Sequence, residues 1–164
     1  MSTELSEGQV SFAPMYVRHV SLIGVMERRN YDFPWSDGIF RDCVKSGYIC
    51  RLVMLEDTVI GYGVMQIGAD EGHILNLCID KPSQGRGFAR VLLEHLIREA
   101  ERRRANIVFL EVRPSNPRAV NLYELNGFNE IGLRKGYYDS KSGREDALVM
   151  ARNLVSNMAD FMRH

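Results

Sequence analysis

The stretch that most limits the fold of this chain is NIVFLEVR at residues 106–113, which is almost entirely apolar. Such a run is typical of a strand that is buried on both faces of a sheet. It follows an amphipathic helical pattern at residues 87–104, which in turn follows the apolar run HILNLCID at residues 73–80. This order of strand, helix and strand predicts a βαβ unit, in which the two strands are parallel.

The sheet extends beyond this unit, because further segments have the composition of strands. They are residues 10–15, 48–56, 58–68, 128–138 and 145–154. A turn around Glu56 and Asp57 predicts an antiparallel hairpin, and a polar loop at residues 139–144 joins the last two strands. The sequence therefore predicts an α/β (α+β) fold, with a mixed, mostly antiparallel central sheet, one parallel pair and helices on both faces.

Two helices are predicted between the first strand and the hairpin. Residues 17–29 carry apolar side chains at helical spacing. A shorter helix is expected to begin after Ser36, whose hydroxyl suits an N-cap. It should run to about Lys45, with Gly47 as the residue that ends it.

Another helix has signals at both of its ends. Asn116 suits the N-cap, Pro117 the first turn, and Gly127 the position just beyond the last turn. Tyr123 follows Asn116 by two helical turns, so we expect both side chains on one face of this helix.

Length and charge limit the classes of function. The 164 residues suit one domain, which we place at residues 1–154, with residues 155–164 as a C-terminal extension. Lys and Arg total 21, as do Asp and Glu, so the net charge favours neither a nucleic acid nor a membrane as partner. No apolar run approaches the ~18 residues of a membrane helix, and the polar N-terminus is unlike a signal peptide. We therefore expect a cytoplasmic protein.

The cysteines do not suggest a cross-linked or metal-bound protein. Cys43, Cys50 and Cys78 are odd in number and have no CxxC spacing. They predict free thiols in a reducing compartment, with neither a disulfide framework nor a metal site.

Small residues gather where the first strand of the βαβ unit gives way to its helix, in the sequence QGRGFAR. Gly85 and Gly87 let the backbone approach a ligand closely, and the start of the helix supplies unpaired N–H groups. Arg86 and Arg90 add positive charge, so the turn is a candidate site for phosphate or pyrophosphate. It lacks the Gly-Lys-Ser/Thr of a Walker loop and the full GxGxxG of a dinucleotide site. The alternative is a turn whose glycines serve geometry alone.

Glu111 places a carboxylate inside the buried run NIVFLEVR. Burying a carboxylate is costly unless it is partnered or functional, and a positioned carboxylate can act as a general base. The alternative for Glu111 is that its side chain merely faces an open side of the sheet. Tyr123 likewise has two interpretations, as a functional residue or as part of the core. His73 and His95 are weaker candidate bases, and His95 is expected to be exposed on its amphipathic helix.

At these residues the chain resembles the GNAT acetyltransferases. The segment Gln84-x-x-Gly87-x-Ala89 is similar to the family's (Arg/Gln)-x-x-Gly-x-(Gly/Ala) loop, which binds the pyrophosphate of acetyl-CoA. This chain departs from the commoner pattern in two ways, because Ala89 replaces the final glycine and Gly85 is an additional glycine. SNPRAVNLYELNGF at residues 115–128 is similar to the family's helix from an asparagine to a tyrosine, followed by Gly-Phe. The resemblance covers roughly residues 10–154 and implies the GNAT fold, in which the parallel pair splays apart.

Further motifs resemble one branch of the family, the bacterial ribosomal-protein alanine N-acetyltransferases, or RimI family. They are DFPWS, LNLCID, LLEHLIRE, LEVRPSN and a tyrosine pair before EDA. The resemblance implies transfer of acetyl from acetyl-CoA to the N-terminal alanine of a small-subunit ribosomal protein, without a metal. A GNAT enzyme that acetylates lysine side chains or small amines is the alternative, and a non-catalytic acyl-CoA-binding module is a third.

The resemblance also implies roles for individual residues. Glu111 matches the general base and Tyr123 the general acid of a direct transfer, while Asn116 matches an asparagine that contacts the cofactor. Cys78 would act as nucleophile only if an acetyl-enzyme formed. The strand that would pair with the pantetheine arm comprises Leu77, Cys78 and Ile79, and the pyrophosphate loop comprises Gln84, Gly85, Arg86, Gly87, Phe88, Ala89 and Arg90.

Four aromatic residues are candidates for binding the peptide substrate. Phe33 and Trp35 would form one wall of a groove, and Tyr137 and Tyr138 another. The alternative is that the first pair only packs the short helix that follows it.

Overall fold

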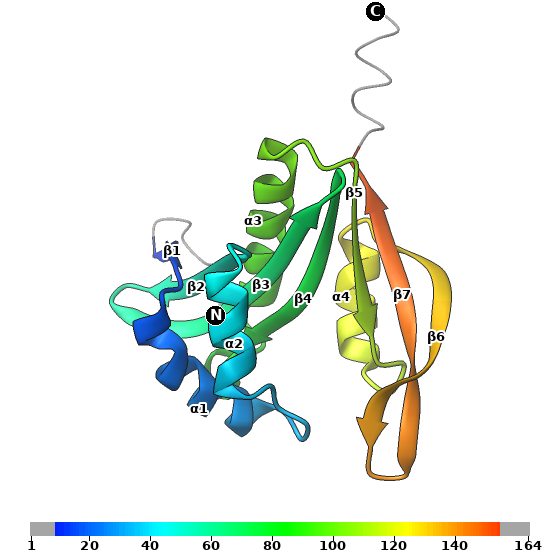
Figure 1. The fold of residues 1–164 in the computed structure, drawn as a ribbon, viewed down its shortest axis with the longest axis horizontal. Coiled ribbons are helices and arrows are strands. Elements are labelled where there is room, and N and C mark those ends of the chain that lie inside the picture. Colours follow the sequence, from blue (N-terminus) through cyan, green and yellow to red (C-terminus); the bar gives the residue numbers. More distant parts are fainter. Residues whose placement is uncertain (1–8, 155–164) are drawn as a thin grey trace, which may run out of the picture. The chain divides into compact units, whose positions relative to one another are not determined.

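The computed structural model describes residues 9–154 (Figure 1), so the C-terminal extension predicted at residues 155–164 lies outside the described residues. The strands are β1 (Val10–Pro14), β2 (Ile49–Leu55), β3 (Thr58–Gly68), β4 (Glu71–Ile79), β5 (Ile107–Val112), β6 (Asn129–Ser140) and β7 (Gly143–Asn153). The α-helices are α1 (Val20–Asn30), α2 (Asp37–Lys45), α3 (Phe88–Arg102) and α4 (Pro117–Leu125). Two short 3-10 helices are η1 (Val17–His19) and η2 (Lys81–Ser83).

The strands form one sheet in the order β1-β2-β3-β4-β5-β7-β6. β4 and β5 are parallel, with a register that runs from Glu71 opposite Ile107 to Ile74 opposite Leu110. The pairs β1–β2, β2–β3, β5–β7 and β6–β7 are antiparallel. These pairings confirm the predicted mixed sheet with its single parallel pair. The splaying of that pair stays a prediction.

Two compact units make up the chain. Of the described residues, 9–66 and 75–96 belong to the first unit, and 67–74 and 97–154 belong to the second. The boundary falls inside β3, β4 and α3, so each of these three elements contributes residues to both units. The single domain expected from the sequence stays a prediction, and each unit is described by itself.

Helices cover both faces of the sheet in the first unit. On one face, Phe40 of α2 meets Tyr62 of β3 edge to face, with 5.6 Å between the ring centroids. On the other face, a Cβ placed on Gly63 would lie 3.1 Å from Leu96 of α3. Neighbouring strand residues point to opposite faces, so α2 and α3 pack on opposite sides of β3.

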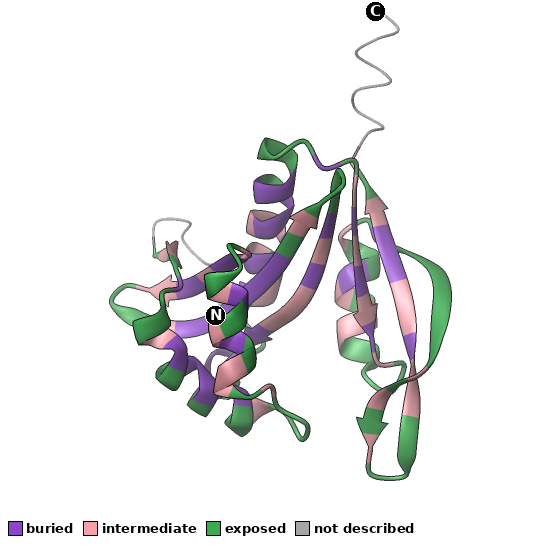
Figure 2. Ribbon diagram, viewed as in Figure 1, coloured by how far each residue is buried: buried purple, intermediate pink, exposed green. Residues whose placement is uncertain are grey.

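A hydrophobic core of this unit includes buried residues of α1 and α2, which are purple in Figure 2. Its buried residues are Met15, Val20, Ile23, Met26, Phe40, Cys43, Cys50, Leu52, Tyr62, Val64 and Cys78.

The capping signals of the sequence are confirmed in α2 and α4. Ser36 Oγ accepts a hydrogen bond from the N–H of Ile39 at 3.2 Å and so caps α2. Asn116 Oδ1 accepts one from the N–H of Ala119 at 3.2 Å and caps α4. Gly127 follows α4 with a φ of 87°, in the left-handed region that favours glycine.

The hairpin of β6 and β7 in the second unit is longer than predicted. The polar loop expected at residues 139–144 is wrong, because Ser140 pairs with Gly143 and only two residues turn the chain. Polar composition suggested a loop, yet both strands are exposed here, so polar side chains stay in water while the backbones pair. Arg144 stabilises this end by pairing with Asp139 at 3.0 Å.

Candidate active site

Glu111 of β5 carries a buried carboxylate with two ionisable partners. Its side chain is only 4% exposed. Oε2 lies 2.5 Å from Nε2 of His73 on β4, and Oε1 lies 3.4 Å from Nε of Arg134 on β6. The carboxylate is therefore partnered, as a buried charge needs to be. All three residues belong to the second unit.

The strand register explains why His73 reaches Glu111. His73 stands directly opposite Phe109 in the parallel pair, and their rings stack with 4.2 Å between centroids. Phe109 and Glu111 are alternate residues of β5, so their side chains lie on the same face. The stacking holds the imidazole where Nε2 contacts the carboxylate.

Two tyrosines of β6 complete the surroundings of Glu111. Burial raises the pKa of the Tyr137 and Tyr138 phenols above the ordinary value, and the negative charge of Glu111 raises both further. The guanidinium of Arg113 lies 4.2 Å from the ring centroid of Tyr138, and that of Arg134 lies 5.6 Å from that of Tyr137. Both phenols therefore keep their protons at neutral pH.

Tyr123 of α4, also in the second unit, is a buried phenol. Its ring meets Phe128 edge to face, with 5.9 Å between centroids. Burial raises the pKa of Tyr123 to about 12. The hydroxyl is therefore protonated at neutral pH, which is the state that a general acid requires. Asn116 uses its side-chain oxygen to cap the same helix.

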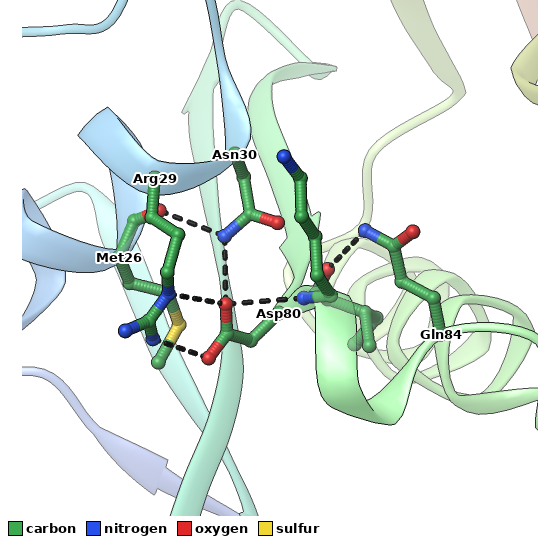
Figure 3. A network of polar contacts seen from close by, with 7 residues as sticks. Met26, Arg29, Asn30, Asp80 and Gln84 are labelled. Carbon is green, nitrogen blue, oxygen red and sulfur yellow. Dashed lines mark hydrogen bonds and ion pairs between the residues drawn. The ribbon is translucent and has the colours of Figure 1, made fainter.

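In the first unit, a polar network holds the end of β4, where the glycine-rich turn begins (Figure 3). The Asp80 carboxylate pairs with the guanidinium of Arg29 from α1, and its Oδ1 accepts a hydrogen bond from Nδ2 of Asn30 at 2.8 Å. The same Nδ2 donates to the carbonyl of Met26 at 2.8 Å, and the N–H of Lys81 donates to Oδ1 at 3.1 Å. Burial alone would raise the pKa of Asp80, but the hydrogen bonds from Arg29 and Asn30 hold it below its ordinary value. The charged carboxylate thus ties the turn to α1.

The turn itself has the backbone expected of an anion site. Nε2 of Gln84 donates to the carbonyl of Ile79 at 2.8 Å, which anchors the turn to the last residue of β4. Gly85 and Gly87 have φ values of 78° and 84°, in the left-handed region where a side chain is strained. Residues with such dihedrals before a helix N-terminus direct successive N–H groups at a bound anion.

The side chains of the turn fit this chemistry in part. α3 begins at Phe88, and the guanidinium of Arg86 lies 5.1 Å from the Phe88 ring centroid. Arg90 pairs with Glu94 one turn further along α3, at 3.4 Å. Both arginines therefore lie beside the turn, and the residues present fit a pyrophosphate. The pyrophosphate role of Gln84 to Arg90 stays a prediction.

The second half of β4 combines a fixed backbone with an unreactive thiol. Tyr31 donates from its hydroxyl to the carbonyl of Leu77 at 2.8 Å. Burial raises the pKa of the Cys78 thiol to about 11, against the opposing effect of hydrogen bonds from Tyr62 and Tyr31. The thiol is therefore protonated at neutral pH and is a poor nucleophile. A Cβ on Gly61 of β3 would lie 2.4 Å from the Cys78 carbonyl oxygen, so only glycine allows β4 to lie this close.

The four aromatic residues predicted to bind substrate differ in exposure. Phe33 is 43% exposed and Tyr137 is 42% exposed. Trp35 packs on Phe40, with 5.2 Å between ring centroids, which agrees with the packing alternative. Tyr138 is half-buried against Tyr137, with 4.8 Å between centroids. The first pair belongs to the first unit and the second pair to the second unit, and their joint role stays a prediction.

Sequence analysis missed another buried carboxylate, that of Glu27 of α1, which is 2% exposed. Oε1 accepts hydrogen bonds from the hydroxyl of Tyr62 at 2.5 Å and from Nδ2 of Asn76 at 3.1 Å. Oε2 accepts one from the N–H of Trp35 at 2.9 Å. A usable signal was present, because Glu27 lies seven residues after the buried Val20 and so falls on the apolar face of α1.

The expectation for one of the two histidines was wrong. His95 is not an exposed residue of α3, because its ring stacks on Phe12 of β1 with 4.0 Å between centroids. His73 was ranked as a weak candidate, yet it contacts Glu111. In both cases the strand arrangement, which no local pattern specifies, decides what the imidazole touches.

Three further observations concern the described residues alone. In residues 9–154, no three His, Cys, Asp or Glu side chains are grouped so that they could bind a metal ion. None of the helices that the structure describes is both long enough and apolar enough to span a membrane. Cys43, Cys50 and Cys78 are all buried free thiols.

Comparison with known proteins identifies the family. Residues 19–128 match the Acetyltransferase (GNAT) family. The ribosomal protein bS18-alanine N-acetyltransferase of Salmonella typhimurium is 40% identical over 126 residues, which cover 77% of this chain and 85% of that protein. The chain belongs to the RimI family of GNAT acetyltransferases. A bS18-alanine N-acetyltransferase from Haemophilus influenzae is 37% identical over 127 residues, covering 77% of this chain and 86% of that one.

A solved structure agrees with this membership. The crystal structure of the ribosomal-protein-S18-alanine N-acetyltransferase from Escherichia coli matches with a TM-score of 0.83 and 34% identity, and covers 88% of this chain and 94% of that one. As a RimI-family member, the chain is an acetyl-CoA-dependent acetyltransferase.

Proposed function

We propose that this protein transfers acetyl from acetyl-CoA to the N-terminal α-amine of a protein that begins with alanine, namely the small-subunit ribosomal protein bS18. The observation that carries the proposal is the buried, partnered carboxylate of Glu111, the residue that the family resemblance matches to the general base. The 40% identity to a bS18-alanine N-acetyltransferase supports the same substrate. We place the reaction in the cytoplasm, with the protein substrate as the partner and no role for nucleic acid or membrane.

Glu111 acts as the general base. A protein α-amine has a pKa near ~8, so much of it is charged at neutral pH and must lose a proton before it can attack. Glu111 accepts that proton, directly or through one water. The amine nitrogen then forms a bond to the thioester carbonyl carbon, and the backbone N–H of Cys78 or Ile79 stabilises the negative oxygen.

Tyr123 acts as the general acid. When the carbon–sulfur bond breaks, the CoA thiolate takes the proton of the phenol. The raised pKa of about 12 ensures that the proton is present on Tyr123 before this step. The transfer is direct, because the buried Cys78 thiol, with its pKa of about 11, does not supply a thiolate for an acetyl-enzyme.

The remaining predicted residues hold the two substrates. The backbone of Leu77, Cys78 and Ile79 pairs with the pantetheine arm, and Asn116 contacts the cofactor. The pyrophosphate lies on the turn from Gln84 to Arg90, whose two left-handed glycines and helix N-terminus support this role. Phe33, Trp35, Tyr137 and Tyr138 bind the first residues of the peptide, and the exposure of Phe33 and Tyr137 supports their part in this.

A peptide panel tests the proposed function. The protein is incubated with acetyl-CoA and an alanine-initiated bS18 peptide, the same peptide with a blocked N-terminus, and a lysine-containing control. Mass spectrometry with fragmentation then locates the acetyl group. We expect acetyl only on the free N-terminal alanine. Acetyl on lysine would replace the proposal by the side-chain or small-amine alternative.

A further inference from the structure

We propose that His73 and Glu111 form a proton-transfer dyad, in which His73 takes the substrate proton from Glu111 and releases it to solvent. The proposal deepens the proposed function and rests on it, because it concerns the fate of the proton that Glu111 removes from the amine. His73 would thus be a further residue of the reaction, beyond the base and the acid that the family resemblance implies.

The contact between the two side chains is short and held from both sides. Nε2 of His73 lies 2.5 Å from Oε2 of Glu111, within hydrogen-bond reach for proton transfer. The ring stacks on Phe109, which stands opposite His73 in the parallel pair, so the imidazole cannot swing away without losing that contact. Arg134 contacts the other carboxylate oxygen, Oε1, and leaves Oε2 to His73.

The difference in exposure between the two side chains sets the direction in which the proton moves. The Glu111 side chain is 4% exposed and that of His73 is 19% exposed. A base that has taken a proton must lose it before the next turnover. The carboxyl has little contact with water, whereas the imidazole has more, so His73 provides the route from the buried carboxyl to solvent.

The other ionisable groups around Glu111 cannot accept this proton. Arg134 of β6 does not deprotonate in proteins. Tyr137 and Tyr138, also on β6, carry raised pKa values and already hold their phenolic protons at neutral pH. On β7, the residue paired with Glu111 is Val149, which does not ionise. Histidine is the side chain that ordinarily changes charge between pH 5 and 8, which leaves His73 as the acceptor among these neighbours.

The step balances in protons and electrons. The lone pair of the amine nitrogen forms the bond to the acetyl carbon, and the carbon–sulfur electron pair leaves with the CoA sulfur. The amine proton passes to Glu111, and Oε2 then passes it to Nε2 of His73, whose other nitrogen starts with a proton. The resulting imidazolium lies beside a regenerated carboxylate and releases its Nδ1 proton to water. Exchange with water then returns a proton to Nδ1 and removes the one on Nε2, so that His73 regains its starting tautomer. The second proton that the nitrogen loses on becoming an amide replaces, through water, the proton that Tyr123 gives to the CoA sulfur. No oxidant, reductant or metal takes part.

The test compares His73→Gln, His73→Ala and the control His95→Gln. Glutamine can keep a hydrogen-bond donor near the position of Nε2 but cannot carry the proton. His95 is a matched control, because its ring also stacks on a phenylalanine, Phe12, at 4.0 Å. Turnover is measured against pH with saturating acetyl-CoA, on whichever amine the wild type acetylates in the peptide panel. If the wild type acetylated only lysine, the proposed function would be rejected. The dyad would still be tested, because turnover would then be measured on the lysine peptide.

We expect both His73 variants to lower kcat by about 10-fold or more at neutral pH, with the KM for acetyl-CoA unchanged. The loss in both variants should be smaller at acidic pH, where an imidazole that is already protonated cannot take the proton in the wild type either, and added imidazole should partly restore His73→Ala. His95→Gln should keep the wild-type profile. A His73→Gln variant with wild-type turnover would overturn the dyad, even if His73→Ala were slow, because His73 would then only position Glu111.

A second measurement needs no change at His73. The 15N signals of the His73 ring are followed against pH in the wild type and in Glu111→Gln. A dyad requires that the removal of the carboxylate charge alters the pH dependence of the His73 signals. An unaltered pH dependence would overturn the dyad. This result does not depend on the His73 variants, so it decides the question even if they fail to fold.

Discussion

Two glutamates with buried carboxylates, Glu27 in the first unit and Glu111 in the second, are surrounded by different kinds of partner. Glu27 accepts hydrogen bonds from a tyrosine hydroxyl, an asparagine amide and a backbone N–H, none of which is charged. Glu111 contacts an imidazole and a guanidinium, and both of these side chains reach solvent. Burial alone therefore does not distinguish a structural carboxylate from a reactive one.

The partners make the distinction. Uncharged donors that are part of the packed core hold Glu27 in one place and connect α1, β3, β4 and the segment before α2. Such a network stabilises the fold as long as every donor is matched. The partners of Glu111 can exchange a proton or adjust to a change of charge, which a base needs in each turnover. Glu27 is thus expected to matter for stability and Glu111 for rate.

The largest expected effect is on turnover. Glu111→Gln should lower kcat by about 100-fold or more, because the amide cannot accept the proton of the substrate amine. The KM for acetyl-CoA should change little. Steady-state kinetics with the alanine-initiated peptide measures both values, and Glu130→Gln, at an exposed position of β6, is the control. Turnover at the wild-type rate would reject Glu111 as the base.

The matching change at the other carboxylate should act on stability. Glu27→Gln should lower the free energy of unfolding by about 2 kcal/mol, because an amide NH2 replaces one acceptor and leaves a buried donor unmatched. Urea denaturation measures the loss. Glu111→Gln should be clearly less destabilising in the same experiment. If the two variants lost equal stability, the contrast between the two carboxylates would be wrong.

A smaller effect on rate is expected at the acid. Tyr123→Phe should lower kcat by about 10-fold and keep the fold, because the phenyl ring preserves the packing on Phe128. With a phenol pKa of about 12, the wild-type hydroxyl stays protonated throughout an ordinary assay range, so the factor should be the same at neutral and at mildly alkaline pH. Parallel pH–rate profiles would agree with this. A wild-type rate in the variant would contradict the acid role.

The raised pKa of Tyr123 also has a consequence for stability. Its folded-state value of about 12 lies above the ordinary value of 10.0, so the protonated phenol stabilises the folded state. This contribution is complete below the ordinary value and is lost as the pH rises through the folded-state value. The alkaline loss of stability should therefore be smaller in Tyr123→Phe, as urea denaturation at several alkaline pH values would show.

The smallest effect is expected at the exposed partner of Glu111. Arg134→Gln should lower kcat/KM by about 3-fold or less, because the Arg134 side chain is 50% exposed and water and salt screen its charge. The difference from wild type should shrink as the ionic strength rises. A large loss that salt did not reduce would contradict this weak role and would show that Arg134 is needed to hold the Glu111 carboxylate in place.

Much of the fold could be predicted from local signals. The caps Ser36 and Asn116 and the stop at Gly127 appear where the sequence placed them, because capping depends on residues only a few positions apart. The parallel pair follows from the order of strand, helix and strand. The end of the β6–β7 hairpin could not be predicted, because pairing between exposed strands leaves no hydrophobic pattern to read.

The sequence by itself determined the family, the glycine-rich turn and the presence of a carboxylate inside an apolar strand, since each of these lies within a short continuous segment. Only the tertiary structure decided what that carboxylate contacts. His73 is 38 residues away from Glu111 along the chain, and the two meet because the register places His73 opposite Phe109. Register is set by the packing of the whole sheet. The same packing gives Glu27 an uncharged partner, the hydroxyl of Tyr62, and stacks the His95 ring on Phe12. No local pattern of residues specifies either contact.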